Sequence, residues 1–143
     1  MNRVSEILGD KGHEVLRIQA DAPVLEAVKQ MVEANIGSLL VEKDGEVAGI
    51  VTERDYLRRV AHEGPTGDEV TVEEIMSSPL IVVNPETPID ECMALMTDRR
   101  IRHVPVVGDG DVVGIVSIGD VVKFKSKQQS FEIRYLTDYI TAG

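Results

Sequence analysis

The chain has 143 residues, of which 43% are hydrophobic and 28% charged, a balance typical of a folded globular protein rather than a disordered one. Its 25 acidic and 15 basic side chains give a net charge of −10, which argues against nucleic acid as the main partner because phosphate binding requires a basic face. A single cysteine, Cys92, excludes an intramolecular disulfide and a zinc site built from several cysteines. No apolar run is long enough to span a membrane and Met1 begins no apolar signal segment, so we expect a cytoplasmic protein without a membrane contact.

The sequence aligns with itself when it is shifted by 65 positions. Over 41 aligned positions the two copies are identical at 12 without a gap, and several other pairs are both apolar. The identities include Gly49 to Val51 with Gly114 to Val116, and Asp55 with Asp120. A long period that occurs twice indicates a duplicated unit, and each copy is too short to bury a core alone. We therefore predict two copies packed face to face as one module. The predicted boundaries are 1–63 for the first repeat, 64–71 for a linker, 72–127 for the second repeat and 128–143 for a C-terminal helix.

Each copy has the pattern strand, helix, strand, strand, helix, which predicts an α/β (α+β) fold of two pseudo-symmetric βαββα repeats. The first helix of copy one starts at Pro23, which suits a first helical turn, and carries apolar residues at helical spacing. Asp44-Gly45 lies between alternating apolar residues and predicts a hairpin turn, because glycine tolerates the positive φ that the turn requires. In chain order we predict a short helix over Val4–Leu8 that leads into this copy, a strand over Val15–Ile18, the helix from Pro23, the hairpin strands Ser38–Val41 and Val47–Val51, and a helix from Glu53.

The second copy repeats these elements. Cys92 aligns with Ala27 on the buried face of its first helix, so we expect an inert core thiol. Beyond residue 126 an apolar stripe at helical spacing includes Phe131, Tyr135 and Tyr139, three of the five aromatic residues. This tail helix packs either on its own domain or against another subunit. We predict a short helix over Val72–Met76 that leads into copy two, a strand over Leu80–Val83, a helix from Pro88, hairpin strands His103–Val107 and Val112–Val116 around Asp109-Gly110, and a helix from Ile118.

The segments 49–55 and 114–120 share the pattern glycine, two apolar residues, Thr or Ser, two further residues and Asp. Thr52 and Ser117 fall where a strand ends, and Asp55 and Asp120 follow three residues into the next helix. One interpretation is a helix capping box, which a duplication would copy. The other is a ligand site, because glycine lets a ligand approach the backbone, a helix start attracts phosphate and a carboxylate accepts two ribose hydroxyls. Both interpretations are open from the sequence.

These two segments, together with Ile-Arg-His-Val-Pro-Val-Val at 101–107, resemble a tandem pair of cystathionine β-synthase (CBS) domains over roughly residues 4–127. The resemblance implies two symmetry-related clefts that hold an adenine nucleotide such as AMP, ATP or NAD. It also implies that the Asp holds the ribose, the Thr or Ser hydroxyl binds ribose or phosphate, the start of the second strand faces the phosphates, and the other copy's first strand reads adenine. By position, one cleft is formed by Ser117, Asp120, Arg102 and His103 with the backbone of Leu16, Arg17 and Ile18, and the other by Thr52 and Asp55 with the backbone of Leu80, Ile81 and Val82.

The two clefts differ in their basic residues. Gly37-Ser38 stands where copy two has Arg102-His103, so the cleft of copy one lacks two cations that face phosphate. It has Arg54 inside its motif instead, where copy two has Gly119. We expect both clefts to be usable, with the copy-two cleft the better phosphate site. If NAD binds, its second half would reach Arg54 or Lys11.

Two functions are compatible with these features. The first is a stand-alone regulatory module that binds an adenine nucleotide and signals energy or redox state to an unknown regulated protein. The second is a ligand-free interaction or scaffold protein that uses its C-terminal helix. An enzyme ranks third, because we find no catalytic residues and no metal ligands at motif spacing. The family resemblance also implies a homodimer through the helix faces 24–32 or 118–124.

Overall fold

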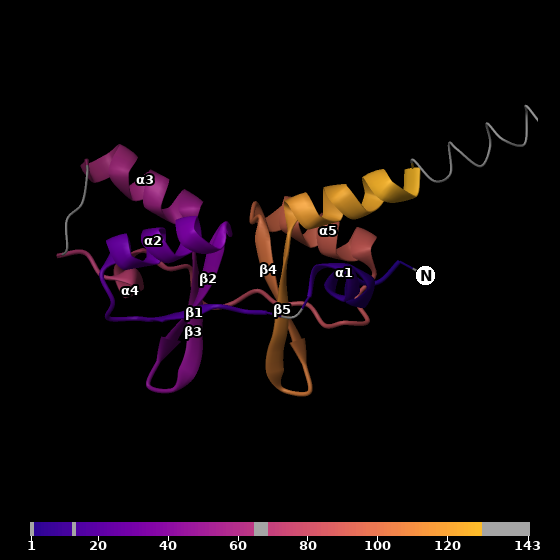
Figure 1. The fold of residues 1–143 in the computed structure, drawn as a ribbon, viewed down its shortest axis with the longest axis horizontal. Helices are drawn as coiled ribbons and strands as arrows, with labels where there is room; N and C mark the ends of the chain where they lie inside the picture. Colours follow the sequence, from indigo (N-terminus) through magenta and orange to yellow (C-terminus); the bar gives the residue numbers. More distant parts are fainter. Residues whose placement is uncertain (1, 13, 65–68, 130–143) are drawn as a thin grey trace, which may run out of the picture. The chain divides into compact units, whose positions relative to one another are not determined.

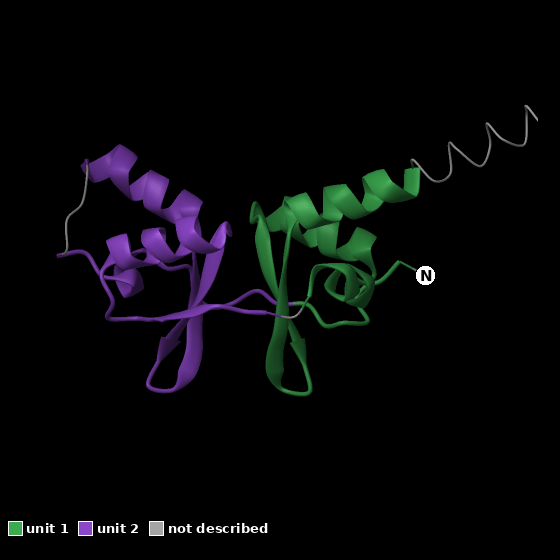
Figure 2. Ribbon diagram, in the orientation of Figure 1, with its two compact units in different colours: residues 1–13, 83–143 green, residues 14–82 purple. Residues whose placement is uncertain are grey.

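The computed structural model describes residues 2–12, 14–64 and 69–129. They form two compact units (Figure 2). We call residues 14–82 the Asp55 unit and residues 1–13 with 83–143 the Asp120 unit, after the aspartate that each contributes to the predicted motif. No helix among the described residues is both long and apolar enough to cross a bilayer.

The Asp55 unit contains a three-stranded sheet in the order β1-β2-β3, in which β1 is parallel to β2 and β2 is antiparallel to β3. The hairpin between β2 and β3 turns at Asp44 and Gly45, whose φ angles of 55° and 80° confirm the predicted Asp-Gly turn. Pro23 lies immediately before the first helix of the repeat. The elements are β1 (Arg17–Gln19), α2 (Val24–Ala34), β2 (Ser38–Lys43), β3 (Glu46–Thr52), α3 (Glu53–Glu63) and α4 (Val72–Ile75) (Figure 1).

The Asp120 unit repeats the helix and the hairpin of this plan. Its hairpin turns at Asp109 and Gly110, with φ angles of 53° and 83°, and Pro88 precedes its first helix. Residues 118–129 are helical, as the sequence predicted for the segment after Ser117. The labelled elements are α1 (Val4–Lys11), α5 (Ile89–Arg99), β4 (His103–Gly108) and β5 (Asp111–Ser117). The tail stripe at 131–139 lies outside the described residues.

The predicted strand Leu80–Val83 is wrong: only Val83 forms a bridge, a parallel one with Val106. In the first repeat, Leu40 N donates to Leu16 O at 3.1 Å and helps to hold β1 on the sheet. The residue that corresponds to Leu40 in the second repeat is Pro105, which has no N–H to donate. The loss of this donor explains why β1 has no full counterpart and β4-β5 is a two-stranded sheet.

The two short helices join the opposite repeats from those we predicted. Val4 N donates to Thr87 O, and Val72 N donates to Ala22 O, both at 2.9 Å. Helix α1 therefore packs with the second repeat, and α4 packs with the first. We had expected each short helix to belong to the copy that follows it in the chain. Instead, α1 packs on the copy that comes later in the chain, and α4 packs on the copy that precedes it.

Glycines in the middle of β3 and β5 make room for these short helices. A Cβ added at Gly114 would lie 2.6 Å from Cδ2 of Leu8. At Gly49 it would lie 2.7 Å from the backbone oxygen of Ser77 and 2.8 Å from the sulfur of Met76. One interpretation of the sequence was that these glycines let a ligand approach the backbone; in the structure both lie inside strands and admit a neighbouring segment of the chain.

Each unit buries its own hydrophobic core, which differs from the expectation that a copy cannot do so alone. The reason is the added short helix, which brings Val4, Ile7 and Leu8 into the core of the Asp120 unit and Val72 into that of the Asp55 unit. Cys92 is fully buried in the first of these cores, and burial raises the pKa of its thiol. The predicted core thiol is confirmed.

Candidate functional site

The two predicted hydroxyl–carboxylate pairs form reciprocal capping boxes at helix starts. Asp55 N donates to Thr52 Oγ1 at 3.2 Å, and Thr52 N donates to Asp55 Oδ2 at 2.8 Å. In the Asp120 unit, Asp120 N donates to Ser117 Oγ at 3.0 Å, and Ser117 N donates to Asp120 Oδ2 at 2.8 Å. The capping interpretation is thus correct for both pairs. The hydroxyls and carboxylates already accept hydrogen bonds from backbone N–H groups at the helix start, so any ligand there binds side chains that also serve as caps.

The start of the second strand of each repeat lies beside the capping pair. His103 is paired with Ser117 across β4 and β5, and Ile118 N donates to Arg102 O at 2.8 Å. In the Asp55 unit, Ser38 is paired with Thr52 across β2 and β3.

These neighbouring residues differ in exposure. Arg102 is exposed and His103 is partly buried, whereas Ser38 is only 6% exposed. Arg54, on the first turn of α3, is exposed. The Asp120 unit therefore presents more accessible cationic surface at its strand start than the Asp55 unit does.

Lys11 lies at the end of α1 and binds the carboxylate of the Asp120 unit. Its Nζ donates to Asp120 Oδ2 at 2.6 Å and to the backbone oxygen of Ile115 at 2.7 Å. Burial of Asp120 favours the neutral acid, but the hydrogen bonds from Lys11 and Ser117 and the lysine's charge outweigh it. Together they lower the pKa of Asp120 below its ordinary value. The Asp120 carboxylate is therefore held ionised, and it forms an ion pair with Lys11.

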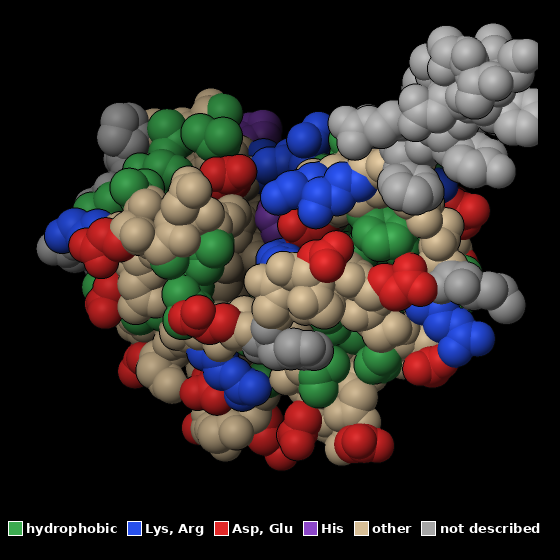
Figure 3. All heavy atoms as spheres, turned by 45° about the vertical axis from the view of Figure 1, so that its right-hand side comes forward, with side chains coloured by type: hydrophobic (Ala, Val, Ile, Leu, Met, Phe, Trp, Pro, Cys, Tyr) green, Lys and Arg blue, Asp and Glu red, His purple; other side chains and the backbone are tan. Residues whose placement is uncertain are grey.

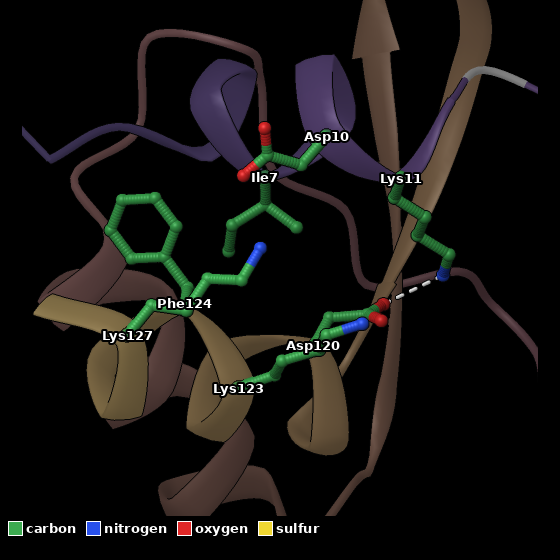
Figure 4. Close-up of a pocket in the computed structure, with 7 residues that line it drawn as sticks. All are labelled: Ile7, Asp10, Lys11, Asp120, Lys123, Phe124 and Lys127. Atoms are coloured by element: carbon green, nitrogen blue, oxygen red, sulfur yellow. Dashed lines mark hydrogen bonds and ion pairs between the residues drawn. The ribbon is translucent and has the colours of Figure 1, made fainter. Parts of the chain in front are cut away.

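A pocket of about 320 Å³ lies beside this ion pair, between α1 and the helical segment 118–129 (Figure 4). Figure 4 shows side chains of both elements directed into this space, with the Lys11–Asp120 bond dashed. Figure 3 shows Lys and Arg side chains gathered over the helical segment. In a protein of net charge −10, this is a local concentration of positive charge. The lining residues are Ile7, Asp10, Lys11, Asp120, Lys123, Phe124 and Lys127.

By sequence count, the residue of the Asp55 unit that matches Lys11 is a proline. The hydrogen bonds of Val4 and Val72 and the glycine contacts of Leu8 and Met76 align α1 with α4. Counting on from those residues, Lys11 corresponds to Pro79. The Asp55 carboxylate therefore receives no lysine from the short helix packed on its unit.

Further along the helices the two units are more alike. Arg58 and His62 stand where the Asp120 unit has Lys123 and Lys127. Phe124 is replaced by Arg59, whose guanidinium forms an ion pair with Glu63. The short-helix lysine is thus a further difference between the two candidate sites.

Both predicted adenine-reading segments belong to the Asp55 unit, whereas the side chains of the two predicted clefts come from both units. Leu16, Arg17 and Ile18 belong to the Asp55 unit, whereas Ser117, Asp120, Arg102 and His103 belong to the Asp120 unit. Leu16 O accepts from Leu40 N, Arg17 pairs with Glu42 at 2.9 Å and Ile18 is buried. Thr52, Asp55, Arg54, Ser38 and the segment Leu80, Ile81 and Val82 all belong to the Asp55 unit. A cleft shared by the two repeats stays a prediction.

Sequence reasoning missed most of the pocket. Lys11 entered it only as a residue that NAD would reach, and Ile7, Asp10, Phe124 and Lys127 were not assigned to a site. The self-alignment begins at residue 15, so nothing in the repeat relates α1 to Asp120. The available signal was the charge of Lys11 at a helix end just before Gly12. Among the described residues, no group of three or more His, Cys, Asp or Glu side chains is arranged to hold a metal ion.

The profile of the family described as "CBS domain" matches residues 4–62 and 72–127. The chain belongs to the CBS domain family. It is 42% identical over 149 aligned positions to "CBS domain-containing protein CBSX3, mitochondrial" of Arabidopsis thaliana, covering 98% of this chain and 72% of that protein. The cytoplasmic location of the present CBS pair stays a prediction.

Solved structures agree with the fold of a CBS pair. The crystal structure of the CBS domain NE2398 has a TM-score of 0.81 and 42% identity, and the match covers 87% of this chain and 98% of that one. The CBS domain pair of protein MJ0100, solved in complex with 5′-methylthioadenosine and S-adenosyl-L-methionine, has a TM-score of 0.77 and 28% identity, covering 90% and 98%. The predicted fold of two βαββα-like repeats is confirmed, as is the family.

Proposed function

We propose that this CBS pair binds an adenine nucleotide, AMP, ATP or NAD, and reports it to a partner protein. The observation that carries the proposal is the ionised Asp120 carboxylate at a helix start, beside a pocket of about 320 Å³ that also contains three lysines. A carboxylate accepts adjacent ribose hydroxyls, and ammonium groups bind phosphate. The relative MJ0100, with two adenosyl compounds bound, supports the adenosine part of the ligand.

In the proposed complex, Asp120 and Ser117 bind the ribose, while Arg102 and His103 lie beside them at the start of β4 and face the phosphates. The backbone of Leu16, Arg17 and Ile18 contributes the contact with adenine. Binding changes the equilibrium between arrangements of the module by as much as the nucleotide's affinity differs between them. A partner that prefers one arrangement then senses the nucleotide.

The Asp55 unit is the second proposed site. Thr52 and Asp55 would bind the ribose, Ser38 lies beside them, and the backbone of Leu80, Ile81 and Val82 would contact adenine. Its exposed Arg54 is the nearest cation within the motif. With a buried Ser38 in place of His103, we expect weaker phosphate binding than at the Asp120 unit.

Isothermal titration calorimetry with AMP, ATP, NAD and S-adenosylmethionine tests this function. We expect micromolar binding of at least one anionic nucleotide, weakened roughly tenfold or more by Asp120→Asn, because a hydrogen bond to a charged group is lost. Asn keeps an oxygen for the helix cap, so the fold is preserved. Asp98→Asn, at a side chain that is 82% exposed, is the matched control and should bind as the unaltered protein does.

Absence of heat with every adenine compound would refute the nucleotide function and favour the scaffold alternative, whose C-terminal helix lies outside the described residues. We propose no catalytic role for this chain. The homodimer stays a prediction, and the exposure of Val32 on α2 and of Val122 on the helical segment 118–129 supports it, since both lie on the helix faces that would be covered.

A further inference from the structure

We propose that Lys11 makes the pocket of the Asp120 unit selective for adenine ligands that carry phosphate, and that it excludes uncharged and cationic adenosine derivatives. The inference rests on the proposed function and specifies the ligand class of the same site. It concerns one residue, on a helix that the repeat does not include, and three observations support it.

The first observation is that Lys11 already binds the Asp120 carboxylate, which the ribose hydroxyls would have to bind. Its Nζ donates to Asp120 Oδ2 at 2.6 Å and to Ile115 O at 2.7 Å. Ribose hydroxyls that bind this carboxylate must compete with an ammonium group, and a charge-assisted hydrogen bond is about twice as strong as a neutral one. A ligand that displaces Lys11 leaves a charged group in a partly buried place without its partner, which is unfavourable unless the ligand supplies a new partner.

The second observation is the charge of the pocket wall. Lys123 and Lys127 lie one and two turns beyond Asp120 on the same helix, and with Lys11 they place three ammonium groups around the pocket (Figure 4). Asp10 and Asp120 supply the two opposing carboxylates. A phosphate offers the displaced Lys11 an anionic partner and also neutralises the remaining lysines. A neutral ligand offers neither, and a cationic ligand is repelled.

The third observation is the internal comparison with the Asp55 unit, whose short helix α4 ends at Ile75 and contains no lysine. Asp55 is bound by Thr52 but by no lysine in the described structure. Both units have basic residues further along the helix, so these do not by themselves distinguish the sites. The proposed selectivity is therefore a property of the Asp120 unit, and it depends on the short helix.

The ligands of the relative MJ0100 provide the contrast for a test. 5′-Methylthioadenosine is uncharged at its 5′ end, and S-adenosyl-L-methionine carries a sulfonium cation there; neither has a phosphate. AMP has the same adenosine with a phosphate at the 5′ position. A comparison of AMP with methylthioadenosine therefore isolates the contribution of the phosphate.

We would titrate AMP and methylthioadenosine into the full chain by calorimetry. NMR spectra recorded during the same titrations assign binding to a unit: amide resonances of residues 117–120 report the Asp120 unit, and those of residues 52–55 report the Asp55 unit. We expect the Asp120 unit to bind AMP roughly tenfold or more tightly than methylthioadenosine. Lys11→Met should bring the two affinities within about threefold, with methylthioadenosine binding more tightly than before because its competitor is gone. Lys11→Arg, which keeps the charge, should preserve a preference for AMP.

The matched control is Lys125→Met, which removes a lysine of the same helical segment that pairs with Asp90 and does not line the pocket. It should keep the original ratio of affinities. A ratio that is unchanged in Lys11→Met, or methylthioadenosine binding at least as tightly as AMP in the unaltered protein, overturns the inference and leaves the nucleotide function standing. If neither compound shifts either set of resonances, the nucleotide function itself is refuted, and the inference with it.

Discussion

The Asp55 and Asp120 units are copies of one repeat, yet each is completed by a different short helix. Helix α1 has eight residues and reaches Lys11, whereas α4 has four and ends at Ile75. Helix α4 could not extend as far as α1 does, because the residue before a proline disfavours helical backbone and Ser78 precedes Pro79. Helix α1 meets no proline and ends at Lys11, and the next residue is Gly12, whose φ of 98° suits glycine.

The consequence is that duplication of the motif did not produce two equal sites. Both units have the hydroxyl–carboxylate cap on the same helix start. Among the described residues, a lysine binds the carboxylate of the Asp120 unit but not that of the Asp55 unit, and this lysine comes from a segment outside the repeat. Similar motifs can therefore differ in ligand preference through residues that no motif contains.

The largest expected effect concerns how strongly each unit depends on its short helix. Leu8 is 1% exposed in the core of the Asp120 unit, whereas Met76 is only partly buried against the Asp55 unit. We expect Leu8→Ala to lower the free energy of unfolding by about 2–5 kcal/mol and Met76→Ala by roughly half as much, because less apolar surface is lost. Urea denaturation measures both. Equal losses would show that the two helices contribute alike.

The next effect tests the contacts between the glycines and the short helices. Gly49→Ala and Gly114→Ala should each lower the free energy of unfolding by about 1–3 kcal/mol, since the added methyl overpacks a buried contact. Gly49→Ala should lower the free energy of unfolding at least as much as Gly114→Ala does. Its methyl meets a backbone oxygen, whereas that of Gly114→Ala meets the Leu8 side chain, which can move more easily.

Two further variants sharpen this test. Gly119→Ala is the control: its methyl would lie 3.6 Å from Ser117 Oγ, and alanine favours a helix, so stability should stay equal or rise. In a Leu8→Ala background the penalty of Gly114→Ala should shrink, because the methyl then has room. If Gly114→Ala destabilises the Leu8→Ala variant as much as it does the unaltered protein, contact with Leu8 is not the cause of its effect.

The smallest effect concerns the ion pair that only the Asp120 unit has. Because the pKa of Asp120 is lowered by folding, its ionised form stabilises the protein above the ordinary aspartate pKa of about 4, and this contribution is lost as the pH falls through the lowered value. Lys11→Met should lower the free energy of unfolding by less than about 1 kcal/mol at pH 7, because partly exposed ion pairs contribute little stability. It should have no effect on stability once Asp120 is protonated.

Thermal or urea unfolding at several pH values, together with an NMR titration of the Asp120 carboxyl, checks this expectation. The titration should show a higher Asp120 pKa in Lys11→Met and no change in Lys125→Met. A pKa of Asp120 that is the same in Lys11→Met as in the unaltered protein would contradict the ion pair.

The elements of each repeat could be predicted from the sequence because their causes are local. Asp44-Gly45 and Asp109-Gly110 adopt the positive φ angles that their residue types allow, and the helices start after Pro23 and Pro88. The capping pairs were likewise predictable, since each spans three residues. The missing strand at Leu80–Val83 was the exception, because it depended on whether Pro105, in a distant strand, could donate a hydrogen bond.

By itself, the sequence determined the duplicated pattern, its turns and the two hydroxyl–carboxylate caps, all of which depend on neighbours within a few residues. The tertiary structure alone decided which short helix joins which repeat, and so that Lys11 binds Asp120 across 109 positions of sequence. That choice depends on how the Leu8 side chain fits over Gly114 and how Met76 fits over Gly49. Such a fit is a matter of shape between distant segments, and neither periodicity nor a motif encodes it.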